Sequence, residues 1–221
     1  MAGYGYGQGP PGGYGQPGYG APPHGQPGYG APGGYGQPGY GAPPGQGMIP
    51  PGVDPQVYQW FIAVDADRSG KISAIELQQA LTNTNWSHFN PEVCRLMIGM
   101  FDRDQSGTID LLEFQSLWTY IQQWRGVFQQ YDRDRSGAIE GAELHTALSQ
   151  MGYNLSPNFI NLVVCKFDVQ ARRQLTLDNF IQACVMLRSI TETFRQKDTG
   201  GMGTIQISYE DFMTMAMLNK P

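Results

Sequence analysis

Apolar side chains recur at steps of three and four residues between positions 114 and 131 of the chain. The apolar positions are Phe114, Leu117, Trp118, Ile121, Trp124, Phe128 and Tyr131. Glutamines, Thr119 and Arg125 fall between them, on the opposite side of a helix with this period. The pattern predicts one amphipathic helix whose apolar side is buried.

Three further helix starts are marked by a polar capping residue followed directly by proline. The pairs are Asp54-Pro55, Asn90-Pro91 and Ser156-Pro157. The side-chain oxygen of such a residue can accept a hydrogen bond from the first turn, and proline is tolerated at the first helical position. Together with the periodic stretches, these signals predict eight helices and an all-α fold.

Three polar segments of the same design interrupt the helical pattern. Residues 65–76 read DADRSGKISAIE, residues 102–113 read DRDQSGTIDLLE and residues 132–143 read DRDRSGAIEGAE. Each has Asp at positions 1 and 3, Ser at 5, Gly at 6, Ile at 8 and Glu at 12. Calcium takes roughly six to eight oxygen ligands, and this spacing supplies them in a twelve-residue loop between two helices. We therefore expect three EF-hand calcium sites rather than three solvated acidic turns.

The expected ligands come from positions 1, 3, 5, 7, 9 and 12, with position 7 contributing its backbone carbonyl and position 9 acting through water. The candidate ligands are Asp65, Asp67, Ser69, Lys71 and Glu76 in loop 1, Asp102, Asp104, Ser106, Thr108, Asp110 and Glu113 in loop 2, and Asp132, Asp134, Ser136, Ala138, Glu140 and Glu143 in loop 3. Loop 1 carries one carboxylate fewer than the others, and the charge of Lys71 should weaken it slightly. The central isoleucines are expected to pair the loops through short β-bridges.

Two later segments keep the frame of such a loop but lack its ligands. In residues 168–179 the arginines Arg172 and Arg173 stand where oxygen ligands and the glycine belong, and residues 198–211 carry a two-residue insertion. Neither segment ends in Glu, so both are expected to be scaffolding. Loop starts 30 residues apart leave room for one helix shared by two hands. EF-hands associate in pairs, and one of five hands is left without a partner. The fifth hand should therefore pair with a hand of a second chain.

The tail after the fifth loop is apolar around nearly the whole of its predicted helix. Its apolar residues are Phe212, Met213, Met215, Ala216, Met217 and Leu218. A helix that is apolar on every side is buried on every side. We expect this tail to lie in a dimer interface rather than folded back on its own domain.

Composition divides the chain near residue 50. Residues 1–50 contain 19 of the 30 glycines and 11 of the 16 prolines, no Asp, Glu, Lys or Arg, and three copies of the octet GQPGYGAP. Such a segment cannot bury enough apolar surface to offset the entropy of ordering, so we expect a disordered arm followed by one domain over 51–221. The arm is either a flexible spacer or a segment that a partner or a membrane surface captures.

Charge, cysteine content and the absence of catalytic patterns narrow the function. The formal net charge is −5, which gives no basic patch for nucleic acid. Cys94, Cys165 and Cys184 each lie in an apolar run, and we expect all three to be reduced core residues in an intracellular protein. Trp60, Trp86, Met97 and Met100 are expected to be core residues as well. We find no nucleophile paired with histidine and no zinc spacing, so we expect no enzyme.

The chain resembles the penta-EF-hand family in the segments YQWFIAVDADRSGKIS, LWTYIQQWRGVFQQYDRDRSG and ALSQMGYNLSP, with a Gly/Pro-rich arm before five hands. The resemblance implies Ca²⁺ as cofactor and dimerisation through the fifth hand, residues 198–221, with another penta-EF-hand protein or with itself. It also implies a cytoplasmic adaptor at the endoplasmic reticulum and transport vesicles that regulates assembly of the vesicle coat with calcium, with peripheral membrane association. The alternatives are the regulatory small subunit of a calcium-dependent cysteine protease and a simple calcium buffer.

Overall fold

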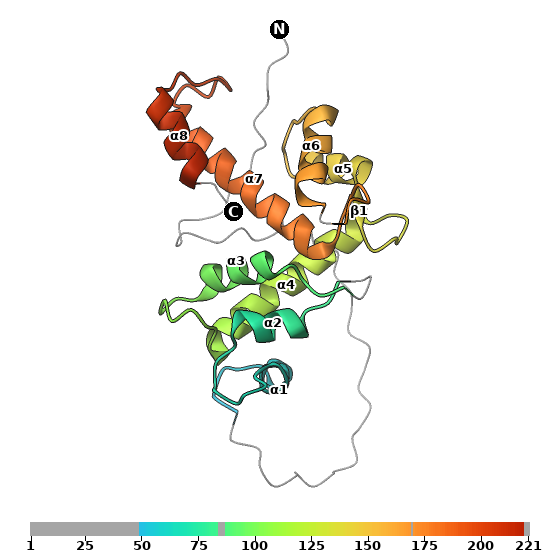
Figure 1. The fold of residues 1–221 in the computed structure, drawn as a ribbon, viewed down its shortest axis with the longest axis vertical. Helices are drawn as coiled ribbons and strands as arrows, with labels where there is room; N and C mark the ends of the chain where they lie inside the picture. The colour runs from blue at the N-terminus through green and yellow to red at the C-terminus, as the bar shows by residue number, and fades with distance from the viewer. Residues whose placement is uncertain (1–48, 84–86, 169, 219–221) are drawn as a thin grey trace.

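Eight helices and one two-stranded antiparallel sheet make up the part of the chain that the computed structural model describes, residues 49–83, 87–168 and 170–218 (Figure 1). The elements are α1 (Pro55–Val64), α2 (Ala74–Ala80), α3 (Pro91–Phe101), α4 (Leu111–Tyr131), β1 (Ile139–Glu140), α5 (Gly141–Gln150), α6 (Pro157–Phe167), β2 (Gln174–Leu175), α7 (Leu177–Lys197) and α8 (Tyr209–Leu218). The predicted all-α fold with eight helices is confirmed. The predicted arm, up to residue 48, and Trp86 lie outside the described residues.

The three capping residues act as their sequence context predicts. Asp54 accepts a hydrogen bond from the N–H of Gln56 at 2.7 Å, and Asn90 accepts one from Glu92 at 2.9 Å. Ser156 caps α6 in the same way. Each of these helices begins with proline, whose missing N–H would have no intrahelical partner at that position.

Two long helices each serve two successive hands. Helix α4 leaves loop 2 and enters loop 3, and α7 leaves residues 168–179 and enters the fifth frame; each has 21 residues. In Figure 1, α7 runs from the middle of the molecule to α8 at its far end. The predicted apolar side of α4 is buried. The rings of Trp124 and Phe128 pack edge-on against the ring of Phe180 of α7, with centroid distances of 5.7 and 5.8 Å.

Short backbone bridges join the hands in pairs. Ile72 and Ile109 exchange two N–H···O bonds of 2.8 and 2.9 Å, which pairs hands 1 and 2. β1 and β2 pair hands 3 and 4, with Ile139 opposite Leu175. Within the described residues, Ile207 of the fifth frame belongs to no strand or bridge. The predicted pairing of hands through β-bridges is therefore confirmed for four hands, and within the described residues the fifth hand shows no such bridge.

A buried aspartate links the two pairs of hands. Asp178, in the first turn of α7 and 2% exposed, accepts a 2.7 Å hydrogen bond from the N–H of Asn90 at the start of α3. The N–H of Asp178 donates to Asn83 Oδ1 at 3.2 Å, and the hydroxyl of Thr176 donates to its other carboxylate oxygen at 2.5 Å. The end of degenerate hand 4 thus holds both ends of the segment between α2 and α3.

One cysteine lies where the sequence did not predict it. Cys94 and Cys184 are buried as expected, whereas Cys165 is exposed on α6. Burial raises the pKa of the Cys94 thiol to about 12. Met97 and Met100 are core residues as predicted.

Candidate calcium sites

Each of the three complete loops is held between fixed helix ends. Asp65, Asp102 and Asp132 are the C-caps of α1, α3 and α4, and their N–H groups still bond to the last turn of the helix. The closing glutamates are the third residues of the exit helices α2, α4 and α5. The first and last predicted ligands of every loop are therefore positioned by helices.

The first aspartate of each loop folds the turn around its carboxylate. In loop 1, one oxygen of Asp65 accepts the N–H of Ser69 and the other accepts the N–H of Gly70, both at 2.9 Å. Asp102 and Asp132 make the same pair of bonds in loops 2 and 3. Gly70 has φ +79°, a conformation that a side chain would oppose.

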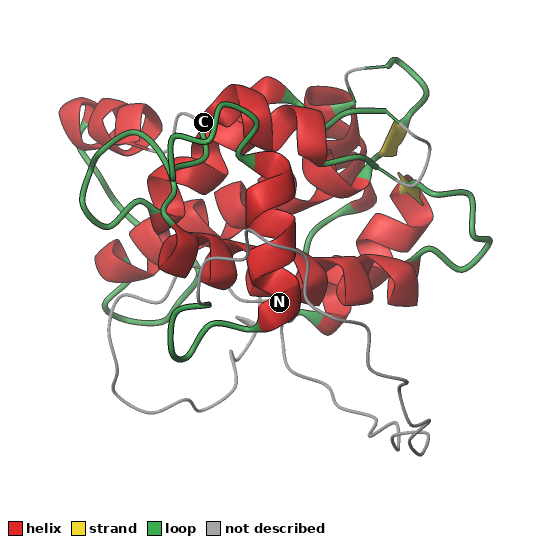
Figure 2. Ribbon diagram, turned by 90° about the horizontal axis from the view of Figure 1, so that it is seen from below, coloured by secondary structure: helices red, strands yellow, loops and turns green. Residues whose placement is uncertain are grey.

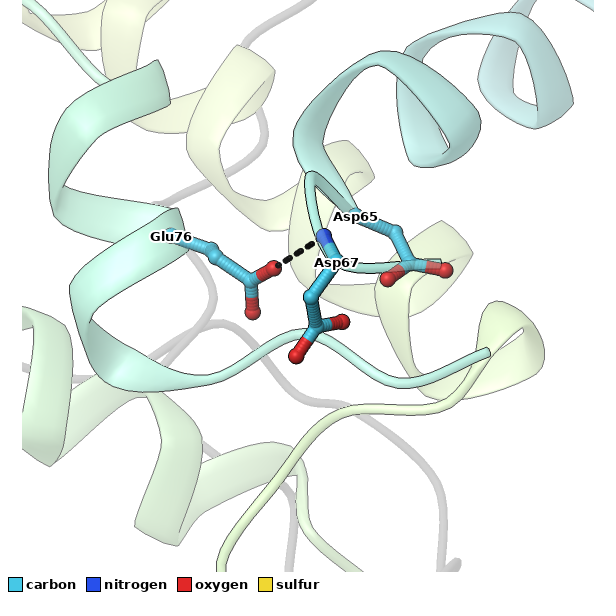
Figure 3. A group of neighbouring side chains, drawn as sticks. All are labelled: Asp65, Asp67 and Glu76. Carbon is cyan, nitrogen blue, oxygen red and sulfur yellow. Dashed lines mark hydrogen bonds between the residues drawn. The ribbon is translucent and has the colours of Figure 1, made fainter. Parts of the chain in front are cut away.

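The closing glutamates turn back into their loops. In loop 1, Glu76 Oε1 accepts the N–H of Asp67 at 3.4 Å (Figure 3) and that of Ala66 at 3.0 Å. Its Oε2 accepts the N–H and hydroxyl of Ser73 at 2.9 and 2.7 Å. Glu113 and Glu143 bind the N–H groups of Arg103 and Arg133 in the same way, both at 2.8 Å. Each glutamate is also part of a capping box.

Three carboxylates converge in each loop. One oxygen from each of positions 1, 3 and 12 lies within 4.8 Å of the other two, and no further cluster of this kind is found among the described residues. The serine at position 5 and the carbonyl at position 7 lie side by side, since Ser69 Oγ donates to the carbonyl of Lys71 at 2.9 Å and Ser136 Oγ to that of Ala138 at 3.0 Å. Hard oxygen donors from five loop positions fit Ca²⁺, and the predicted ligands are the residues that would hold it.

Hydrogen bonds keep several of these carboxylates ionised. Ser106, through its hydroxyl and its N–H, lowers the pKa of Asp104 to about 2. Ser69 lowers the pKa of Asp67, and the N–H of Ser73 does the same for Glu76. Asp132 differs, because burial raises its pKa. At neutral pH the loops are therefore sites of concentrated negative charge, which a divalent cation offsets.

One contact of loop 1 was not predicted. The ammonium group of Lys71 lies 3.3 Å from Oδ2 of Asp104, the residue at position 3 of loop 2. The sequence suggested only a backbone role for Lys71 and a slight weakening of its own loop. A contact between residues 33 positions apart has no signature in the spacing of either loop.

The two degenerate loops keep the turn and lose the ligand set. Asp168 accepts the N–H of Arg173 at position 6, as the first residue of a complete loop does, but its other bond comes from Gln170 at position 3. At position 12, Asn179 is buried and donates to Thr176 Oγ1 at 3.1 Å. In the fifth frame the final carboxylate, Asp211, forms an ion pair with Lys197 at 2.9 Å.

The profile of the EF-hand domain pair matches residues 55–119 and 121–185. Over 170 residues the chain is 58% identical to peflin of Xenopus laevis, an alignment that covers 76% of this chain and 60% of that protein. It is 56% identical to human peflin over 172 residues, 77% of this chain and 61% of that protein. It is also 41% identical to mouse sorcin over 197 residues, 87% of this chain and 97% of sorcin. The chain belongs to the penta-EF-hand family.

Solved structures agree with this assignment. A homolog of programmed cell death 6 protein from Leishmania major Friedlin matches this penta-EF-hand protein with a TM-score of 0.66 and 27% identity, over 74% of this chain and 94% of that one. Ca²⁺ is the cofactor that the EF-hand pairs and the acidic clusters indicate.

This penta-EF-hand protein spans about three fifths of the length of the peflins that it matches. Across the described part, none of the helices has the length and apolar character needed to span a membrane.

Proposed function

We propose that this protein is a calcium sensor and adaptor that binds Ca²⁺ in loops 1–3 and dimerises through its fifth hand. Its partner is another penta-EF-hand protein, or a second copy of this chain. The dimer acts in the cytoplasm and peripherally on membranes of the endoplasmic reticulum and transport vesicles, where it regulates coat assembly in a calcium-dependent way. Membership of the family supports the dimer, and the vesicle role rests on the resemblance alone.

The observation that carries the proposal is the apolar surface of the fifth hand. On and before α8, the side chains of Met202, Tyr209, Phe212 and Met217 are 79%, 79%, 56% and 68% exposed. Clusters of large apolar side chains in water are costly, and on soluble proteins they mark interfaces. Methionine is flexible and repacks readily, which suits a non-identical partner.

The backbone supports the same surface. Hands 1 to 4 each have a bridge partner, whereas Ile207, at the matching place in the fifth frame, has none within the described residues. A strand edge with free N–H and C=O groups favours pairing with another chain. A second fifth hand would supply both that strand and an apolar helix face.

Sedimentation of a variant tests the dimer. Changing Met213 and Met217, which are exposed one turn apart on α8, to Asp should leave the fold intact and shift the protein to monomer, alone or with its partner. Leu162→Asp on α6 is the control, because it charges an exposed apolar side chain outside the fifth hand. A double variant that remains dimeric would contradict the proposal.

Capture from a lysate, with and without calcium, separates the competing functions. An adaptor should recover another small EF-hand protein together with trafficking factors, in amounts that change with calcium. A protease subunit would recover a large catalytic chain. A buffer would recover neither, and its sedimentation would not respond to calcium.

A further inference from the structure

Lys71 belongs to one calcium loop by its backbone and to another by its side chain. Its carbonyl faces the oxygens of loop 1, where it accepts the hydroxyl of Ser69 at 2.9 Å. Its ammonium group crosses to loop 2 and lies 3.3 Å from Oδ2 of Asp104. The antiparallel register that places Ile72 opposite Ile109 also sets Lys71 opposite Asp110, a second acidic residue of loop 2.

This ion pair differs from the others that the described residues form. The pairs Arg188–Glu192 and Lys197–Asp211 involve none of the predicted ligands, whereas Lys71 contacts one. The second pair of hands has no equivalent, because position 7 of loop 3 is Ala138, a buried residue without charge. An ion pair between one loop and a predicted ligand of the paired loop is therefore seen only for hands 1 and 2 among the described residues.

We propose that Lys71 is an internal counter-ion of loop 2, which competes with Ca²⁺ for Asp104 and so sets the calcium affinity of that loop. The inference rests on the proposed binding of calcium by loop 2. Without calcium, the ammonium group offsets part of the repulsion among the carboxylates of Asp102, Asp104 and Glu113. When calcium binds, Asp104 turns to the ion, and Lys71 is left beside a divalent cation of like charge.

The same residue couples the two loops. Calcium in loop 1 would bind the carbonyl of Lys71 and fix the backbone that carries the ammonium group. The position of this group relative to Asp104 then depends on the occupancy of loop 1. The affinity of loop 2 should accordingly change when loop 1 is filled, and this change should vanish once the lysine charge is removed.

The expected effect is modest because the pair is exposed. The side chains of Lys71 and Asp104 are 41% and 54% exposed, and exposed ion pairs shift equilibria by roughly two- to fivefold. Lys71→Gln should therefore raise the calcium affinity of loop 2 about two- to fivefold at low salt. The gain should shrink at high ionic strength, where exposed charges are screened.

The experiment isolates loop 2 in the full chain. Glu76→Gln and Glu143→Gln together remove the closing carboxylates of loops 1 and 3, and titration calorimetry with CaCl₂ then measures loop 2 alone. Lys71→Gln is compared in this background with Arg68→Gln, which removes the same charge from the same loop at an exposed residue for which no ion pair is seen. Lys71→Arg, which keeps the charge, should retain the original affinity.

Two further measurements test whether Lys71 stabilises the calcium-free protein and whether its effect on calcium affinity is confined to loop 2. In calcium-free protein, Lys71→Gln should lower the melting temperature, because it removes a counter-charge, while in saturating calcium it should raise it. In a background with only loop 1 intact (Glu113→Gln, Glu143→Gln), Lys71→Gln should change the affinity no more than Arg68→Gln does.

Three results would overturn the proposal in distinguishable ways. Equal effects of Lys71→Gln and Arg68→Gln on loop 2 would mean that general charge, not the contact with Asp104, sets the affinity. A larger effect of Lys71→Gln on loop 1 than on loop 2 would place its action in its own loop. The proposed role of loop 2 would be overturned as well if the Glu76→Gln, Glu143→Gln protein bound no calcium and Glu113→Gln did not change calcium binding by the full chain.

Discussion

The pKa values of single carboxylates are shifted in opposite directions in loops that look equivalent in sequence. Asp132, which opens loop 3, is buried, and its pKa is raised by the loss of solvent. In loop 2 the pKa of Asp104 is held at about 2 by Ser106. Since calcium binds carboxylates only in their ionised form, protons compete with the ion at a higher pH in loop 3 than in loop 2.

This difference predicts the order in which the loops lose calcium on acidification. As the pH falls from 7 towards 4, Asp132 begins to take up a proton while Asp104 is still ionised, so the affinity of loop 3 should fall first. The measurement is calcium affinity against pH for variants in which two of the three closing glutamates are changed to Gln. If loop 2 weakened at the higher pH, the burial of Asp132 would not govern the site.

At the scale of the elements, the end of hand 4 serves as a fastening point between the two pairs of hands. The carboxylate of Asp178 accepts bonds from Asn90 and Thr176 in a site that excludes water. Truncating a buried acceptor leaves its donors without partners, which is costly. The retained loop 4 therefore has a role in addition to pairing with loop 3.

Asp178→Ala should reduce the free energy of unfolding by about 2–4 kcal/mol, because a buried N–H and a hydroxyl lose their acceptor and a small cavity forms. Asp168→Ala is a suitable comparison, since Asp168 is less buried and its carboxylate accepts bonds from N–H groups of its own loop. Urea unfolding of calcium-free protein measures both. Equal and small losses in the two variants would show that the link contributes little.

The elements that the sequence predicted correctly are those encoded by local patterns. Helix α4 follows from the spacing of its apolar residues, and the starts of α1, α3 and α6 follow from capping residues before proline. Cys165 was mispredicted although the helical period of α6 can be read from the sequence. The buried side of α6 is formed by Ile160, Val163, Val164 and Phe167, and Cys165 lies on the exposed side.

Long-range polar contacts could not be predicted from the sequence. Asn90 and Asp178 are 88 residues apart, and Lys71 and Asp104 are 33 apart. Composition and periodicity show that such residues are polar and where on an element they lie. They do not show which distant group each one meets, because that depends on how the paired hands pack together.

At the scale of the whole molecule, two pairs of hands share one core and the fifth hand projects from it. Figure 2 shows the helices gathered in one body, and Figure 1 places α8 beside the far end of α7. The core cluster extends from α1 to α7 and includes the isoleucines of the bridges, whereas none of the α8 side chains that the structure describes is part of it. The dimerisation proposed for the fifth hand should therefore leave the calcium loops undisturbed.

Deleting residues 1–50 should leave the melting temperature and the calcium stoichiometry nearly unchanged. The described residues enclose a continuous apolar core without the arm, and the arm itself has no apolar periodicity with which to pack on it. Circular dichroism and calorimetry of the truncated chain check this. A large fall in melting temperature would mean that the arm packs on the domain.

The central claim is that calcium binds in loops 1–3 and in neither degenerate loop. Titration calorimetry of the full chain with CaCl₂ tests it, with Glu76, Glu113 and Glu143 changed to Gln singly and together. An amide cannot supply the charged bidentate clamp that closes the site. Each single change should remove one of three sites, and the triple variant should bind no calcium. Calcium retained by the triple variant at wild-type affinity would contradict the account.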